Sequence, residues 1–367
     1  MTESVTIGLV GAGFIGQMHA LAFRNAAMTA WQPPVAVRLK TVAETDETLG
    51  RTIAARYGWE NWTADWRDIV EDPEIQLVIN AGPNHLHGEP TVAAARAGKH
   101  VFCEKPLAAS AEEAWRIWKD VAETGVIDLC AFMYRSMPAL NLAREMIGSG
   151  ELGEVRHYRS RFLLTMLTAD GRLNWRFSRS KAGPGALGDL GSHHIDQARF
   201  LVGEVTKTWS RDAAGAVTDV NDDAFVCAAE LENGATASFE ASRVAGAHNL
   251  GGWIEVDGTR RSIAYHMERL NELVVTEPGK GSRTQMVTGA AHPYADFWLP
   301  VGIQGQHPLG WNEIFAHQAR HMLAAVALGE PVAPRAGFED GYRVAETVEA
   351  IERSAQSGRF EEVRIRA

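Results

Sequence analysis

The chain has few cysteines, no cluster of basic residues and no long apolar run. Its 367 residues contain only three cysteines, Cys103, Cys130 and Cys227, and no CxxC pair. An odd number without metal-type spacing argues against a disulfide framework or a zinc site and favours a reducing compartment, so we expect a cytoplasmic protein. No stretch approaches the ~20 apolar residues of a membrane-spanning helix. The first residues lead directly into a strand-like run, so we expect no signal peptide.

The charge balance excludes two classes of partner. The chain carries 36 Lys and Arg against 46 Asp and Glu, a formal net charge of -10. Nucleic acids and anionic membrane surfaces both require clustered basic residues, so neither is expected as a partner. Hydrophobic residues make up 46% and charged residues 22%, as in ordinary globular proteins. At roughly 100–200 residues per domain, the length predicts two domains.

The first 130 residues alternate between strand-like and helix-like segments. Short runs rich in β-branched residues are separated by helix-like segments, two of which are closed by a glycine, Gly58 and Gly98. This alternation predicts an α/β domain with a doubly wound parallel sheet, a Rossmann fold, over residues 1–130. The expected strands are 5–10, 37–42, 77–80, 100–103 and 126–131, and the expected helices are 15–23, 49–57, 89–97 and 111–123.

From about Val155 onward, strand patterns dominate. Asn233-Gly234 and Asp257-Gly258 lie between strand-like runs, as in tight hairpin turns. We therefore expect an α+β substrate-binding domain over residues 131–367 with a large, mostly antiparallel sheet. Residues 293–308 have the pattern of an irregular loop, and helices are expected at 311–328 and 338–354. The last helix could pack back on the first domain.

A glycine-rich segment follows the first expected strand. Residues 11–16 read Gly-Ala-Gly-Phe-Ile-Gly and open a helix, the context in which GxGxxG predicts dinucleotide binding. In such turns the first glycine permits the tight turn, the second lets the backbone approach a pyrophosphate, and the third allows close packing of helix on strand. The expected cofactor contacts in this segment are Gly11, Gly13, Phe14, Ile15 and Gly16.

An acidic residue at the end of the second strand should bind the ribose hydroxyls. Glu44 is the first candidate and Asp46 the second. A carboxylate there repels a 2′-phosphate, and no arginine directly follows Glu44, so NAD is favoured over NADP. The spacing from Gly16 exceeds the usual ~20 residues, and residues 31–34 are the expected insertion.

Three further motifs occur in order along the chain. They are residues 81–87 (Ala-Gly-Pro-Asn-His-Leu-His), residues 97–106, which end in Glu-Lys-Pro, and residues 188–196 (Gly-Asp-Leu-Gly-Ser-His-His-Ile-Asp). Together they resemble the glucose-fructose oxidoreductase, inositol dehydrogenase and rhizopine catabolism (Gfo/Idh/MocA) family, most of all its scyllo-inositol and L-glucose dehydrogenase subgroup. The resemblance implies an NAD(P)-dependent oxidoreductase that acts on a CH–OH group, and it covers nearly the whole chain.

The resemblance also assigns site residues. It implies a catalytic set formed by Lys105, Asp189 and His193, which also contact the substrate. It also places Lys105 near the cofactor, together with four more residues: Asn84, His87, Glu104 and Arg135. Two further substrate contacts are implied, Arg176 and His317, although Arg176 could instead lie in an interface and His317 in the core.

The residue types suit alcohol oxidation on physical grounds. Oxidation of a secondary alcohol removes a proton from oxygen and a hydride from carbon, and histidine is the natural base near neutral pH. In a helix that begins near Asp189, this residue and His193 would share one face, so Asp189 could orient the imidazole or bind the sugar. The ammonium of Lys105 would stabilise a developing alkoxide. No metal ligand cluster is evident.

The leading hypothesis is an NAD-dependent dehydrogenase that oxidises a ring hydroxyl of a cyclic polyol or pyranose, such as an inositol or L-glucose, to the ketone or lactone. Two alternatives remain: a non-enzymatic NAD-binding sensor of the same fold, and a redox glycosidase that holds NAD tightly. The resemblance also implies a homo-oligomer, either a tetramer or a dimer.

Overall fold

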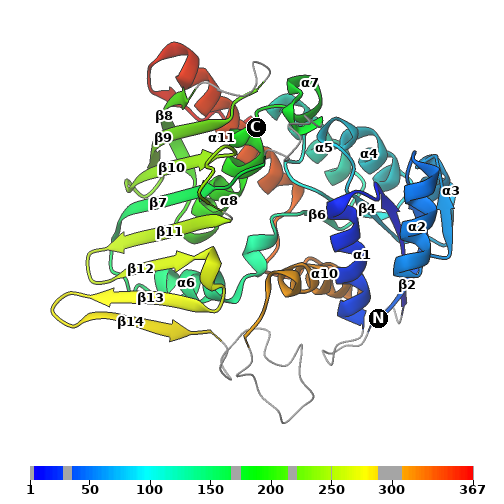
Figure 1. Ribbon diagram of the computed structural model, residues 1–367, viewed down its shortest axis with the longest axis horizontal. Helices are drawn as coiled ribbons and strands as arrows, with labels where there is room; N and C mark the ends of the chain where they lie inside the picture. The colour runs from blue at the N-terminus through cyan, green and yellow to red at the C-terminus, as the bar shows by residue number, and fades with distance from the viewer. Residues whose placement is uncertain are drawn as a thin grey trace, which may run out of the picture.

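The computed structural model describes residues 4–27, 35–166, 175–213, 221–248, 250–287 and 308–366. The expected insertion at residues 31–34 and nearly all of the expected loop at 293–308 lie outside these ranges. Within them the chain forms two sheets, and the helices α8, α10 and α11 lie between the sheets or beside them (Figure 1).

The first sheet is parallel and has the strand order β3-β2-β1-β4-β5-β6. This is the doubly wound order of dinucleotide-binding folds, so the prediction of a Rossmann domain is confirmed. Its strands are β1 (Ser4–Val10), β2 (Ala36–Ala43), β3 (Asn61–Thr63), β4 (Leu77–Asn80), β5 (His100–Cys103) and β6 (Asp128–Cys130). The sequence pattern did not predict β3, which has only three residues.

Helices cover both faces of this sheet. α1 (Phe14–Ala27) and α2 (Glu47–Tyr57) pack together, whereas α3 (Arg67–Glu71), α4 (Gly88–Arg96) and α5 (Ala111–Ala122) form the opposite layer. Local sequence fixes both ends of α2. Asp46 caps α2 by accepting the Leu49 N–H at 3.0 Å, and Gly58 ends it in the left-handed conformation.

The second sheet has nine strands in the order β14-β13-β12-β11-β7-β10-β9-β8-β15. All neighbours are antiparallel except β7 and β10, so the predicted mostly antiparallel sheet is confirmed. Its strands are β7 (Val155–Leu163), β8 (Val205–Ala213), β9 (Ala224–Leu231), β10 (Thr236–Ser242), β11 (Gly251–Gly258), β12 (Ser262–His266), β13 (Glu272–Glu277), β14 (Gly281–Met286) and β15 (Glu361–Glu362).

Burial alternates strictly along β9 and β10, so one face of this sheet is packed and the other is exposed. α6 (Pro138–Gly148), α8 (Ser192–Leu201) and α11 (Phe338–Ser357) pack beside it, and α11 contacts both β8 and α5. α10 (Trp311–Leu328) packs on α1. The two C-terminal helices therefore reach back to the Rossmann domain, with Trp118 of α5 stacked on Tyr342 of α11.

Candidate active site

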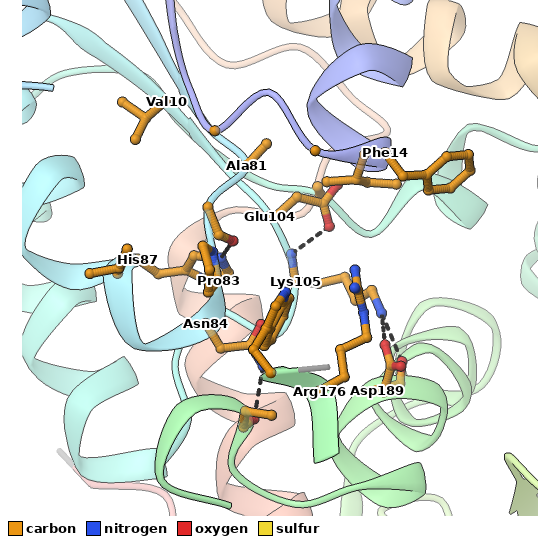
Figure 2. A pocket seen from close by; sticks show the side chains of 18 of the residues that line it. Val10, Phe14, Ala81, Pro83, Asn84, His87, Glu104, Lys105, Arg176 and Asp189 are labelled. Carbon is orange, nitrogen blue, oxygen red and sulfur yellow. Dashed lines mark hydrogen bonds and ion pairs between the residues drawn. The ribbon is translucent and has the colours of Figure 1, made fainter. Parts of the chain in front are cut away.

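A cavity of about 650 Å³ lies between the two domains. Residues from the carboxyl ends of the first sheet form one side, and residues of β7, α8 and α10 form the other. Figure 2 shows Lys105 of the first domain reaching Asp189 of the second, with Arg176 beside them. Ligands of open α/β sheets bind at this edge, so the cavity is the candidate active site.

The glycine turn at the start of α1 leaves space for a phosphate. Gly11 has φ +90°, and a Cβ there would lie 2.9 Å from the Ala81 backbone. A Cβ on Gly16 would lie 2.0 Å from the Gly11 oxygen, so only glycine permits this helix packing. A Cβ on Gly13 would meet no heavy atom within 4 Å, although Gly13 lines the cavity. Phe14 and Ile15 line it too, and the arrangement fits a pyrophosphate at the helix N-terminus.

Glu44 lies beside this turn, at the end of β2. Its carboxylate accepts the Ala12 N–H at 2.9 Å and the Asp46 N–H at 3.2 Å, and it lines the cavity. Asp46 instead caps α2 and is not among the lining residues described. The geometry therefore favours Glu44 over Asp46 as the ribose ligand.

The loop after β4 supplies Asn84 and His87, which both line the cavity. The Asn84 amide donates to the Ala182 oxygen at 2.8 Å, and this bond joins the two domains. The His87 ring is fully buried, with Nδ1 at 2.9 Å from the Pro106 oxygen and Nε2 at 3.0 Å from the Gly82 oxygen. Burial lowers the pKa of His87 although the two carbonyl oxygens oppose this shift, and the ring between them holds the loop in place.

Glu104 has two hydrogen-bond partners, and one of them, His19, belongs to none of the motifs. One carboxylate oxygen contacts His19 Nε2 of α1 at 2.7 Å, and the other accepts the Lys105 N–H at 3.0 Å. Burial alone would raise the pKa of Glu104, but His19 and then Lys105 keep it below its ordinary value. His19 is 1% exposed and packs edge-on against Phe102 and Phe315. Sequence reasoning missed it because its partner lies 85 positions away.

Lys105 and Asp189 form an ion pair across the domain boundary. Lys105 Nζ donates to the Asp189 carbonyl oxygen at 2.8 Å and to its carboxylate at 2.9 Å (Figure 2). Burial alone would raise the pKa of Asp189, but the charges of Lys105 and Arg176 hold it below its usual range. Arg176 lines the cavity on this side, with its guanidinium over the Trp175 ring.

His193 presents a neutral imidazole to the same cavity. It is 7% exposed, and burial followed by the Lys105 charge lowers its pKa well below 6.5. The ring packs edge-on against Tyr134, with centroids 4.8 Å apart, and also contacts Phe132 and Phe162. Its Nδ1 has no hydrogen-bond partner among the described residues. A neutral, buried imidazole can accept a proton from a substrate hydroxyl.

The local helix differs from the expected one. Residues Leu187–Gly191 form a π-helical turn that precedes α8, so Asp189 and His193 do not share a regular α-helical face. Position 191 in this turn requires glycine, because a Cβ there would lie 2.7 Å from the Phe225 ring. Asp222 accepts the Leu187 N–H at 2.7 Å and caps the turn. The Asp189 carboxylate binds Lys105 and not the His193 imidazole, so Asp189 does not orient this ring in the structure.

Two predicted ligand contacts lie outside the cavity lining. Arg135 is turned into the protein interior, where its guanidinium binds Asp196 and Asp340. His317 is fully buried on α10, with Nδ1 at 3.1 Å from the Ser136 oxygen. Arg135 as a cofactor contact and His317 as a substrate contact are therefore corrected to interior residues. The residue beside Arg135, Tyr134, lines the cavity in its place.

Aromatic and apolar side chains form a further part of the cavity lining. None of these residues was given a role in the site by the sequence analysis. They are Tyr134, Phe162, Leu164, Met166, Trp175, Leu250, Trp311 and Phe315. At the other end of the cavity, next to Glu44, Trp66 forms part of the lining.

The fold and this site define a nicotinamide-dinucleotide-dependent oxidoreductase of two domains. Comparison with known proteins agrees. Residues 5–132 match the family model of the NAD-binding Rossmann fold of the GFO/IDH/MocA oxidoreductases, and residues 140–264 match that of the family's C-terminal domain. The chain belongs to the GFO/IDH/MocA family, as its motifs predicted.

Similar proteins include sugar and polyol dehydrogenases. The chain is 38% identical to levoglucosan dehydrogenase of Pseudarthrobacter phenanthrenivorans, with 96% of each chain covered. It is 28% identical to inositol 2-dehydrogenase of Rhizobium meliloti, with 97% of this chain and 98% of the relative covered. A solved structure of levoglucosan dehydrogenase in complex with NADH and levoglucosan superposes with a TM-score of 0.92 at 37% identity, and covers 99% of this chain and 100% of the other.

Proposed function

We propose that this protein is an NAD-dependent dehydrogenase that oxidises one ring hydroxyl of a pyranose, anhydrosugar or cyclic polyol. The observation that carries the proposal is the convergence of Lys105, Asp189 and His193 on one cavity that begins at a glycine turn fitted to a pyrophosphate. When bound, the nicotinamide supplies the hydride acceptor.

The side chains divide the remaining work. His193, neutral and buried, accepts the hydroxyl proton. The Lys105 ammonium holds the same oxygen and stabilises its developing negative charge. Asp189, ionised beside Lys105, accepts a hydrogen bond from a second sugar hydroxyl. Arg176 extends the polar side of the cavity toward the substrate.

The aromatic and apolar part of the lining supports a ring substrate. Sugar rings present C–H surfaces as well as hydroxyls, and aromatic side chains such as Trp175 and Trp311 bind the C–H faces. An anhydrosugar has fewer free hydroxyls than its parent sugar. This part of the lining and the similarity to levoglucosan dehydrogenase both favour levoglucosan as the first substrate to test.

The test is a turnover assay at 340 nm with NAD and a panel that contains levoglucosan, myo-inositol, scyllo-inositol, L-glucose and D-glucose. NADH production with at least one member is expected, with NADP a weaker cofactor because Glu44 lies at the ribose position. NADH binding without turnover of any member would favour a sensor. Cleavage of a glycoside without net NADH would favour a redox glycosidase.

We also propose that the protein is a homo-oligomer in the cytoplasm. The open face of the nine-stranded sheet supports oligomerisation, because it exposes 55% of Val226 and 39% of Trp209. Among the described residues no helix is long and apolar enough to cross a membrane. Light scattering at working concentration tests the assembly, and a monomer would contradict it.

A further inference from the structure

Arg135 and His317 both stabilise the same short turn. This turn, Met133–Ser136 (η2), follows β6 and presents Tyr134 to the cavity. Behind it, His317 Nδ1 of α10 donates to the Ser136 oxygen at 3.1 Å, and the Asn141 amide of α6 donates to the Arg135 oxygen at 2.8 Å. The Arg135 side chain supplies the third attachment.

Arg135 binds α8, the helix that carries His193. Its Nε lies 3.0 Å and 3.1 Å from the two Asp196 carboxylate oxygens, and its Nη2 lies 2.6 Å from one of them. Asp196 is 1% exposed and lies about one helical turn after His193. A planar guanidinium held at several points fixes orientation as well as distance, which a lysine cannot do.

The same guanidinium also contacts α11, through Asp340 at 3.0 Å. Asp340 accepts a second bond from Arg199 of α8 at 3.1 Å, and Arg199 is paired with Glu204 at 2.7 Å. Arg199 is therefore another buried arginine of the same charge network. Arg135 is part of the turn that carries Tyr134, whereas Arg199 makes no described bond to that turn.

His193 depends on its packing for orientation. Because its Nδ1 has no described hydrogen-bond partner, the ring plane is set by Tyr134, Phe132 and Phe162. Tyr134 has the shortest centroid distance of the three, and it precedes Arg135 in the chain. Any shift of the turn relative to α8 would therefore move the Tyr134 ring against the imidazole.

We propose that Arg135 is a positioning residue that locks the turn carrying Tyr134 to helix α8 through Asp196 and so fixes the angle at which His193 meets the substrate hydroxyl. The proposal rests on the proposed function insofar as His193 is the base. It assigns Arg135 to the alignment of the reacting groups and not to cofactor affinity. Misplacement of about 1 Å by a distant mutation can reduce turnover about 100-fold.

The test compares Arg135→Lys with Arg199→Lys. Both retain a cation beside Asp340 and lose a multiply bonded guanidinium, so both should lower the melting temperature to a similar extent. Only Arg135→Lys should lower kcat, by at least about tenfold, while the Kd of NADH stays within about twofold. Asp196→Asn, which keeps the side-chain shape, is the second variant and should reproduce the loss of kcat.

The histidine signals provide a readout that does not need turnover. In labelled protein, His193 is assigned by comparison with His193→Asn, and its ring resonances should shift in Arg135→Lys and Asp196→Asn but not in Arg199→Lys. Equal loss of kcat in the two lysine variants, in proportion to lost stability, would reduce Arg135 to a structural role. Tenfold weaker binding of NADH by Arg135→Lys would instead support the earlier assignment of Arg135 as a cofactor contact. If wild-type protein oxidises no sugar, the proposed function fails while the NMR comparison still decides the positioning role.

Discussion

Replacement of Lys105 with methionine removes one charge from the site and keeps the length of the side chain. In the native protein the ammonium donates to the Asp189 carbonyl oxygen at 2.8 Å and to its carboxylate at 2.9 Å. Loss of one donor to a developing oxyanion reduces turnover roughly 10²–10³-fold. We therefore expect kcat of Lys105→Met to fall by about that factor, with the Kd of NADH changed less than about tenfold.

The same variant should shift the pH profile in a defined direction. The Lys105 charge helps to hold the pKa of His193 below 6.5, because it opposes a second cation nearby. Without this charge the pKa of His193 rises toward its ordinary value. The acid limb of kcat/KM should therefore move to higher pH in Lys105→Met, which initial rates between pH 4.5 and 8 would measure.

The cost in stability should be moderate. The side chains of the pair are 14% and 23% exposed, between a surface ion pair worth ~1 kcal/mol or less and a buried one whose disruption costs ~3–5 kcal/mol. Lys99→Met is a matched control, since the buried Lys99 binds the Asp72 and Ile75 oxygens away from the cavity. It should lose stability but keep kcat. Turnover of Lys105→Met within threefold of wild type would refute the assigned role.

Two other substitutions test separate parts of the site, and a third tests a buried histidine outside the cavity lining. Gly13→Ala places a methyl group in the space fitted to the pyrophosphate, so calorimetry should show about tenfold weaker NADH binding with little change in melting temperature; unchanged binding would contradict the fit. Glu44→Ala removes the carboxylate that repels a 2′-phosphate, so the ratio of kcat/KM for NAD over NADP should fall at least about tenfold, and a constant ratio would exclude Glu44 as the discriminating group. Burial lowers the pKa of His194 from 6.5 to about 3, so its neutral form contributes stability that is complete above pH 6.5 and is lost as the pH falls toward 3. His194→Phe should therefore show a smaller decline in melting temperature between pH 6.5 and 4.5, and a parallel decline would argue against this.

The sequence predicted the Rossmann domain well because its signals are local. Alternating buried strands and glycine-ended helices need no knowledge of distant residues, and the glycine turn carries its own steric reason at Gly11 and Gly16. The three-residue strand β3 escaped prediction because it is held by pairing with β2, and its residues are intermediate or exposed. The π-helical turn escaped too, and the close approach of its Gly191 to Phe225 on β9 joins residues far apart in the sequence.

The candidate site was predictable up to the orientation of individual side chains. Lys105 and Glu104 directly follow a buried strand. In a parallel sheet the carboxyl ends of the strands lie at the edge where ligands bind. Arg135 and Tyr134 are adjacent in a single 3₁₀ turn, and only the tertiary structure decides which of them faces the cavity. Here the carboxylates of Asp196 and Asp340 bind the Arg135 guanidinium in the interior. The Tyr134 side chain lines the cavity instead. A motif alone cannot contain that information.

One cation from the first domain lowers the pKa of two groups in the second. Lys105 stabilises the carboxylate form of Asp189, which lowers its pKa, and it destabilises the imidazolium form of His193, which also lowers its pKa. Oxidation of an alcohol needs both results, an ionised acceptor for a neighbouring hydroxyl and a neutral base for the reacting one. Because Lys105 lies on the Rossmann domain and the other two lie on the turn and helix after Leu187, contact between the two domains favours both states. Separation of the domains should therefore move both pKa values back toward their ordinary values.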